Sequence, residues 1–194
     1  MSARVSLANL LTSGNLAAGF LALILAEQGD FAWAAGCVGT AALCDSVDGL
    51  VARLTKSECE FGSQLDSLAD LVSFGIVPAL AVYLSVVESV PVAGIAACLG
   101  FLLCGAYRLA RFQVDEESRR RFVGLSIPPS GLIVVGLAAV QAPRGLTLAV
   151  VIVLSLLMVS RIPFPTLAEI RRLTLAPARR ARRARVQVAQ AIRK

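Results

Sequence analysis

The chain has 194 residues, of which 57% are hydrophobic and only 16% carry a charge. This composition excludes intrinsic disorder, collagen and coiled coil, and it is too apolar for an ordinary soluble domain of this size. The sequence also lacks histidine, which excludes a histidine base, the usual zinc sites and a Ser-His-Asp triad. We therefore predict an integral membrane protein whose chemistry uses other side chains.

Six apolar segments follow one another along the chain, most of them near the length that crosses a hydrocarbon layer of about 30 Å. They cover residues 7–26, 31–54, 65–87, 91–109, 127–141 and 146–160. The first segment opens with several polar residues, so residues 2–12 are expected to lie along the membrane surface before the chain turns inward. The predicted fold is an all-α bundle of six transmembrane helices with a short N-terminal interfacial helix.

The net charge of +6 is concentrated at the C-terminal end, because residues 170–194 contain nine of the nineteen Lys and Arg and no acid. We predict that residues 1–169 form a single transmembrane domain and that residues 170–194 form a basic cytoplasmic tail. The partner expected for this tail is an anionic membrane surface and not nucleic acid, with a merely solvated tail as the alternative.

Lysine and arginine in the short connections indicate the orientation of the bundle. They fall on one side of the predicted membrane, except Arg144, while the opposite connections hold Glu27, Asp30 and Glu88. Because the positively charged side of a membrane protein faces the cytoplasm, both termini are expected there. The prediction is a multi-pass protein of the inner or plasma membrane.

Four aspartates interrupt the second and third apolar segments. Asp45 and Asp48 follow one apolar run, and Asp66 and Asp70 open the next. An ionised carboxylate within a transmembrane segment costs roughly 2.5–3.5 kcal/mol on insertion scales, so four of them require compensation. Spacings of three and four residues place each pair on one helical face, and two neighbouring antiparallel helices can direct all four into one pocket.

Four converging negative charges require cations. The nearby fixed bases are Arg53, Lys56 and either Arg108 or Arg111, which makes a divalent metal the better counter-charge. Hard oxygen ligands without Cys or His favour Mg²⁺ or Mn²⁺ over zinc. The alternative is that one or two of the acids lie at a solvated helix end.

A string of residues at fixed separations joins the two aspartate pairs. It reads Asp45-x2-Asp48-Gly49-x2-Ala52-Arg53-x8-Gly62-x3-Asp66-x3-Asp70. This string resembles the signature of the CDP-alcohol phosphotransferases at every position, and the resemblance implies the fold of that family and a homodimer. Gly49 and Ala52 would leave room for a nucleotide on the helix, and Gly62 would permit close backbone approach. Taken separately, they would be helix-packing positions and a turn glycine.

The resemblance also implies a reaction and the role of each residue in it. A phosphatidyl-type group passes from a CDP-activated lipid to an alcohol, releasing CMP, so residues 1–169 are expected to be catalytic. The four aspartates would bind Mg²⁺ or Mn²⁺, with two ions per site, and Asp70 would also take the proton from the attacking hydroxyl. Direct attack is favoured over a covalent lipid-enzyme intermediate. The residues implied to bind the CDP-lipid are Asp48, Gly49, Ala52, Arg53, Gly62 and Asp66.

Three further stretches resemble the small bacterial and archaeal phosphatidylserine synthases within that family. They are residues 9–20, residues 107–112 with 122–129, and residues 157–165. The chain departs from their pattern at Gln113, where Asn is expected, and at Ser126, where Pro is expected. This resemblance implies CDP-diacylglycerol or CDP-archaeol as the donor and L-serine as the acceptor. Glycerol 3-phosphate and inositol phosphate stay open as alternative acceptors.

Two arginines and one asparagine complete the predicted site. Arg108 and Arg111 lie three residues apart on one helical face near the cytoplasmic end, where they could bind an acceptor carboxylate or a lipid phosphate. Alternatively, they are anchors that reach the headgroups. Asn15 is either a substrate contact or a polar contact within the bundle.

Two other classes of function are compatible with acids inside a membrane. One is a small cation transporter or channel, and the other is an inactive scaffold. An ion pathway has no need of Gly49, Ala52, Arg53 and Gly62 at fixed distances from the acids, so the string favours the enzyme. The intact acids argue against a scaffold.

Overall fold

The computed structural model describes residues 7–55, 60–114 and 124–160, all within a compact unit of residues 1–162. Four features predicted from the sequence lie outside the described residues: the start of the interfacial helix at residues 2–6, Lys56, residues 122–123 and 161–165 of the stretches that resemble the family, and the basic tail at residues 170–194. Over the described ranges the chain is helical, with no strand. The predicted all-α class is therefore confirmed for this part of the chain.

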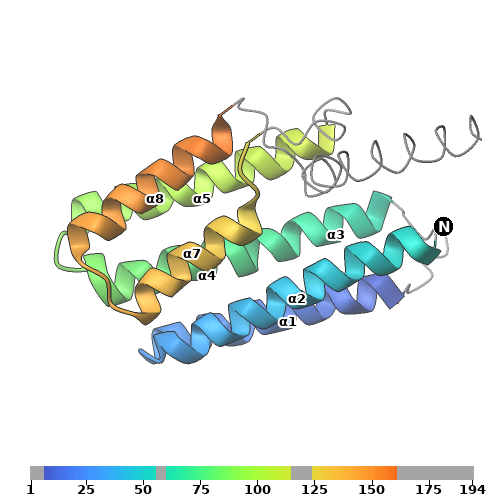
Figure 1. The fold of residues 1–194 in the computed structure, drawn as a ribbon, viewed down its shortest axis with the longest axis horizontal. Helices are drawn as coiled ribbons and strands as arrows, with labels where there is room; N and C mark the ends of the chain where they lie inside the picture. The colour runs from blue at the N-terminus through green and yellow to red at the C-terminus, as the bar shows by residue number, and fades with distance from the viewer. Residues whose placement is uncertain (1–6, 56–59, 115–123, 161–194) are drawn as a thin grey trace, which may run out of the picture. The chain divides into compact units, whose positions relative to one another are not determined.

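The described helices follow one another along the chain (Figure 1). They are α1 (Leu7–Glu27), α2 (Phe31–Thr55), α3 (Glu60–Asp70), η1 (Leu71–Ile76), α4 (Val77–Val82), η2 (Tyr83–Val87), α5 (Pro91–Val114), α7 (Ile127–Ala139) and α8 (Arg144–Val159). The elements α3 to η2 form one unbroken helical stretch, in which η1 and η2 are π-helical.

By length and composition, four of the described helical stretches can cross a membrane. They are Asn9–Glu27, Phe31–Val51, Glu60–Val87 and Pro91–Val114. Helices α7 and α8 are also apolar, but they have only 13 and 16 residues. The structure therefore supports four of the six predicted crossings on length and gives two shorter apolar helices at the predicted places.

Three predicted boundaries differ from the structure. The third helical stretch begins at Glu60 and not at residue 65, because its first turns are amphipathic and hydropathy does not register them. The fourth continues to Val114, past its last apolar run. The separate interfacial helix is not confirmed, since residues 7–12 are the first turns of α1 itself.

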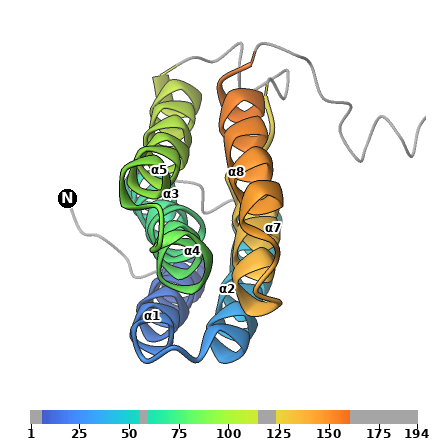
Figure 2. The ribbon, with the colours of Figure 1, turned by 90° about the vertical axis from the view of Figure 1, so that its left-hand side faces the viewer.

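The described helices form two layers, which Figure 2 shows nearly end-on. Helices α1, α3, α4 and α5 make one layer, and α2, α7 and α8 make the other. The layers meet most closely where α1 packs on α2, α4 on α7, and α5 on α8. Fully buried Phe74, Phe101 and Ile127 fill the space between them together with many alanines and valines. Small side chains let membrane helices approach closely, which gives this core its dispersion energy.

The contact between α7 and η1 depends on a glycine. A Cβ atom at Gly131 would lie 2.6 Å from the Phe74 carbonyl oxygen and 2.8 Å from its Cα, so only a residue without a side chain fits there. The π-helical stretch adjoins Pro78, which has no N–H to donate to the carbonyl four residues earlier. Such π-helical turns widen a helix and often occur next to functional sites. Here η1 begins directly after Asp70.

Replacing Gly131 by valine is expected to lower stability by about 1–3 kcal/mol, as overpacking of a tight core does, or to prevent folding. The matched control is Gly136→Val on the same helix, where a Cβ atom has no neighbour within 4 Å. Thermal unfolding of both variants in detergent checks this expectation. Equal melting temperatures for the two would contradict the close approach of α7 to η1.

Candidate metal centre

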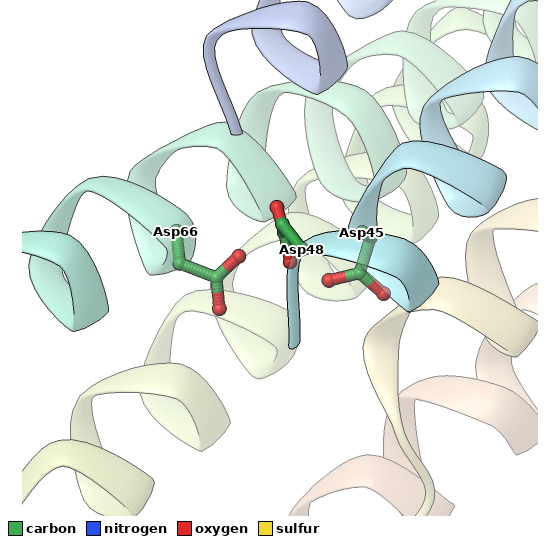
Figure 3. Close-up of side chains that lie close together, drawn as sticks. All are labelled: Asp45, Asp48 and Asp66. Carbon is green, nitrogen blue, oxygen red and sulfur yellow. The ribbon is translucent and has the colours of Figure 1, made fainter. Parts of the chain in front are cut away.

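Three carboxylates from two helices meet at one point. Asp45 and Asp48 reach from α2 and Asp66 from α3, and Figure 3 shows them directed toward one another. One oxygen of each lies within 4.8 Å of an oxygen of both others. Opposite ligands of Mg²⁺ stand about 4 Å apart, because each binds at about 2.0–2.1 Å. The three oxygens are thus close to the spacing at which one divalent ion contacts them all.

Helical spacing explains how these side chains meet. Asp45 and Asp48 lie one turn apart on the same face of α2, and Asp66 lies in the middle of α3. Both helices pack against α1, which brings their acidic faces together although 18 or more residues separate the two pairs in the sequence. The convergence therefore results from helix packing and not from a local loop.

The surroundings of the carboxylates fit a hard cation. Asp48 is buried, with 5% of its surface exposed, and it accepts a hydrogen bond from the Thr12 hydroxyl at 2.9 Å (Oγ1 to Oδ2). The Oδ1 atom of Asp66 is buried and has no hydrogen-bond partner. A buried anionic oxygen without a donor is costly unless a cation binds it. With only carboxylate oxygens in the group, Mg²⁺ and Mn²⁺ fit better than zinc.

Asp70 lies beside this group, at the last residue of α3. It is 7% exposed and accepts a hydrogen bond from the Asn15 amide at 3.2 Å (Nδ2 to Oδ1). It is also near enough to Asp45 and Asp66 for their negative charges to repel its own. Three of the four predicted acids therefore share one point, and the fourth is adjacent and separately hydrogen-bonded.

The predicted arginines lie on the last turns of α5. The Arg108 guanidinium lies 5.8 Å from the centre of the Phe112 ring and is attracted by the charge of Asp70. Its Nε atom is buried without a hydrogen-bond partner. Arg111 follows three residues later and is half-buried. A half-buried guanidinium next to an acidic group, with its buried Nε donor unused, is suited to binding a further anion.

The glycines of the string lie on the helices that carry the acids. Gly49 follows Asp48 on α2, and Gly62 lies one turn before Asp66 on α3. Ala52 and Arg53 belong to the last turns of α2, and their side chains lie outside the described residues. The residues of the string thus lie near the end of α2 and the start of α3, on the same helices as the carboxylates.

Two contacts at this site were missed from the sequence. Thr12, read as part of a surface helix, is buried against Asp48. Gln113, noted only as a departure from a pattern, donates from Nε2 to the Ser67 hydroxyl at 2.6 Å and to the Ser63 carbonyl at 2.8 Å, which ties α5 to α3. The position of Thr12 three residues before Asn15, on one helical face, was the available signal for the first. The sequence held no signal for the second.

Comparison with known proteins identifies the family of the chain. The family model described as CDP-alcohol phosphatidyltransferase matches residues 5–176, which is most of the chain. The matched range includes all four aspartates and both arginines.

Curated relatives carry the same kind of name. A CDP-diacylglycerol–serine O-phosphatidyltransferase of Helicobacter pylori is 31% identical over 173 residues, covering 84% of this chain and 73% of the relative. The enzyme of that name from Bacillus subtilis is 33% identical over 156 residues, covering 80% and 88%. An archaetidylserine synthase of Methanothermobacter thermautotrophicus is 34% identical over 164 residues, covering 83% and 70%. The chain belongs to the CDP-alcohol phosphatidyltransferase family.

Proposed function

We propose that the protein transfers a phosphatidyl group from CDP-diacylglycerol to the hydroxyl of L-serine and releases CMP. The observation that carries the proposal is the meeting of Asp45, Asp48 and Asp66 within 4.8 Å in a member of this transferase family. The choice of serine is supported by the names of the bacterial relatives. Family membership also favours this reaction over a cation transporter, and the intact aspartates argue against an inactive scaffold.

The acids are proposed to bind the activating metal. Asp45, Asp48 and Asp66 would hold one Mg²⁺ or Mn²⁺ ion, and Asp70 would contribute to a second. When bound, the ions supply positive charge that neutralises and aligns the diphosphate, which is the main requirement of phosphoryl transfer. The residues along the string, Gly49, Ala52, Arg53 and Gly62, are proposed to receive the CDP part of the donor beside them.

Asp70 is proposed to act as the base. The bond that forms joins the serine hydroxyl oxygen to the lipid-bearing phosphorus, and the bond that breaks joins this phosphorus to the oxygen of CMP. The hydroxyl proton passes to Asp70, which also accepts a hydrogen bond from the Asn15 amide. In a chain without histidine a carboxylate is the natural acceptor, and the attack is direct.

Arg108 is proposed to bind the acceptor. Its unused Nε donor lies in the region of Asp70, so a serine carboxylate held there would place the serine hydroxyl toward the base. Arg111 would bind the phosphate on the lipid side, and Asn15 would contact the substrate through its remaining amide oxygen. That oxygen is buried and has no hydrogen-bond partner in the structure.

The arrangement in the membrane is part of the proposal. Six crossings would place both termini and the acids at the cytoplasmic face, where serine and the cytidine group arrive from water while the lipid tails stay in the bilayer. Helices α7 and α8 rise only about 20 and 24 Å at 1.5 Å per residue, so crossing requires the hydrocarbon layer to be thin there. A homodimer and a basic tail at residues 170–194, beyond a catalytic domain of residues 1–169, complete the proposal.

A second donor has specific support. One relative is named an archaetidylserine synthase, which supports CDP-archaeol as the alternative to CDP-diacylglycerol. Glycerol 3-phosphate and inositol phosphate stay as alternative acceptors for the same chemistry.

Purified protein supplied with CDP-diacylglycerol and Mg²⁺ or Mn²⁺ is expected to release CMP when L-serine is added. Little release is expected with glycerol 3-phosphate or inositol phosphate, because neither has the carboxylate that Arg108 is proposed to bind. Parallel assays of the three acceptors measure this. Release of CMP with glycerol 3-phosphate and none with serine would end the serine assignment.

Removal of a single charge from the centre should stop the reaction. Asp66→Asn is expected to reduce CMP release more than about 100-fold, which exceeds the loss typical of changes outside the ligand set. The matched control is Asp30→Asn, an exposed aspartate directly before α2, which should keep wild-type activity. Equal activity of the two variants would contradict the assignment of Asp66.

Asp70→Asn is expected to abolish turnover while the protein stays folded and still binds CDP-diacylglycerol. The amide keeps the shape of the side chain, but it cannot accept the hydroxyl proton. Turnover and equilibrium binding of the donor, measured on the same preparation, separate the two effects. Full activity in this variant would refute Asp70 as the base.

A further inference from the structure

Helix α1 presents two buried donors to two different carboxylates. Thr12 and Asn15 lie three residues apart on one face and are 4% and 0% exposed. The Thr12 hydroxyl donates to Asp48 on α2 at 2.9 Å, and the Asn15 amide donates to Asp70 on α3 at 3.2 Å. One face of α1 therefore contacts both helices that carry the acidic pairs.

The position of α1 against the third helical stretch is fixed by further contacts. The buried Ser73 hydroxyl of η1 donates to the Asn15 carbonyl oxygen at 3.2 Å. One turn later, a Cβ atom at Gly19 would lie 3.0 Å from the Ser73 Cβ atom and would collide with its hydroxyl. Only glycine leaves room for Ser73 at this place. These contacts fix how α1 is aligned along the third helical stretch. They thereby hold the Asn15 amide beside Asp70, which precedes Ser73 by three residues.

Each donor occupies one oxygen of its carboxylate. Thr12 contacts Oδ2 of Asp48 and Asn15 contacts Oδ1 of Asp70, so each donor holds its carboxylate through one oxygen. A carboxylate fixed by a buried hydrogen bond has already lost the rotational freedom that metal binding would otherwise remove. Such outer contacts orient the ligands of many metal sites.

We propose that Thr12 and Asn15 are positioning residues that orient Asp48 and Asp70 before divalent ions bind. The role rests on the proposed metal site and extends it to α1, which contributes no aspartate to that site. It gives the amide nitrogen of Asn15 a function that is separate from the substrate contact proposed for its oxygen. It also explains why polar residues are buried in an otherwise apolar helix.

The test is direct Mn²⁺ binding to the full chain in detergent, without substrates, followed by electron paramagnetic resonance. Thr12→Val keeps the shape of the side chain but removes the donor, and it is expected to weaken Mn²⁺ binding by about 10- to 100-fold. Thr12→Ser retains the hydroxyl and should restore most of the affinity. The matched control is Thr40→Val, because the exposed Thr40 hydroxyl donates within its own helix, to the Gly36 carbonyl at 3.0 Å.

Asn15→Leu is expected to weaken Mn²⁺ binding in the same way, through Asp70. A second measurement separates a positioning role from a general loss of structure. The activity of Thr12→Val should recover at high Mn²⁺ concentration, and its KM for CDP-diacylglycerol at saturating metal should equal that of the wild type. The melting temperature without metal verifies the fold, and Thr12→Ala carries the same test if the valine variant is not obtained folded.

The outcomes separate this inference from the proposed function. Wild-type protein that binds no Mn²⁺, or an Asp45→Asn variant that binds it like wild type, would overturn the metal site and the positioning role with it. Unchanged affinity in both Thr12→Val and Asn15→Leu, beside weakened binding in Asp45→Asn, would overturn only the positioning role. Loss of affinity in Thr40→Val equal to that in Thr12→Val would also overturn it.

Discussion

The repulsion between closely spaced carboxylates is the constraint on which the rest of this structure depends. Asp45, Asp48 and Asp66 approach within 4.8 Å in helices apolar enough to cross a membrane, and Asp70 lies beside them. In a medium of low dielectric such charges repel strongly and are poorly solvated. The helices hold them together because packing elsewhere in the bundle is tight and because α1 supplies hydrogen bonds to two of the four. A divalent cation would supply the remaining compensation.

Close backbone contacts give the bundle the rigidity that this arrangement needs. Gly131 lets α7 lie against the backbone of η1, and Gly19 lets α1 approach Ser73 on the same stretch. Both contacts hold the π-helical segment that directly follows Asp70. The widened turns are therefore enclosed from two sides, so the aspartate at their start is fixed relative to α1 and α7.

Helix α5 connects the acids to the basic part of the site. Its direct contact with α3 is slight compared with its packing on α8, so the hydrogen bonds from Gln113 to Ser63 and Ser67 carry much of the connection. They set the distance between the helix of Asp66 and the helix of Arg108. Asparagine at position 113, one methylene shorter, would reach both serines only if α5 moved closer.

The sequence by itself determined the class of fold, the places of the helices, the pairing of the aspartates and the family. Each of these follows from the composition or from the spacing of residues close together in the chain. Periodicity of three and four residues puts Asp45 beside Asp48, whatever the helix packs against. Only the tertiary structure decided that Thr12 contacts Asp48, that Gln113 bridges to α3 and that a π-helical stretch follows Asp70. These contacts join segments 36 and 46 residues apart, or depend on a neighbouring helix, and their register follows from the packing of the whole bundle.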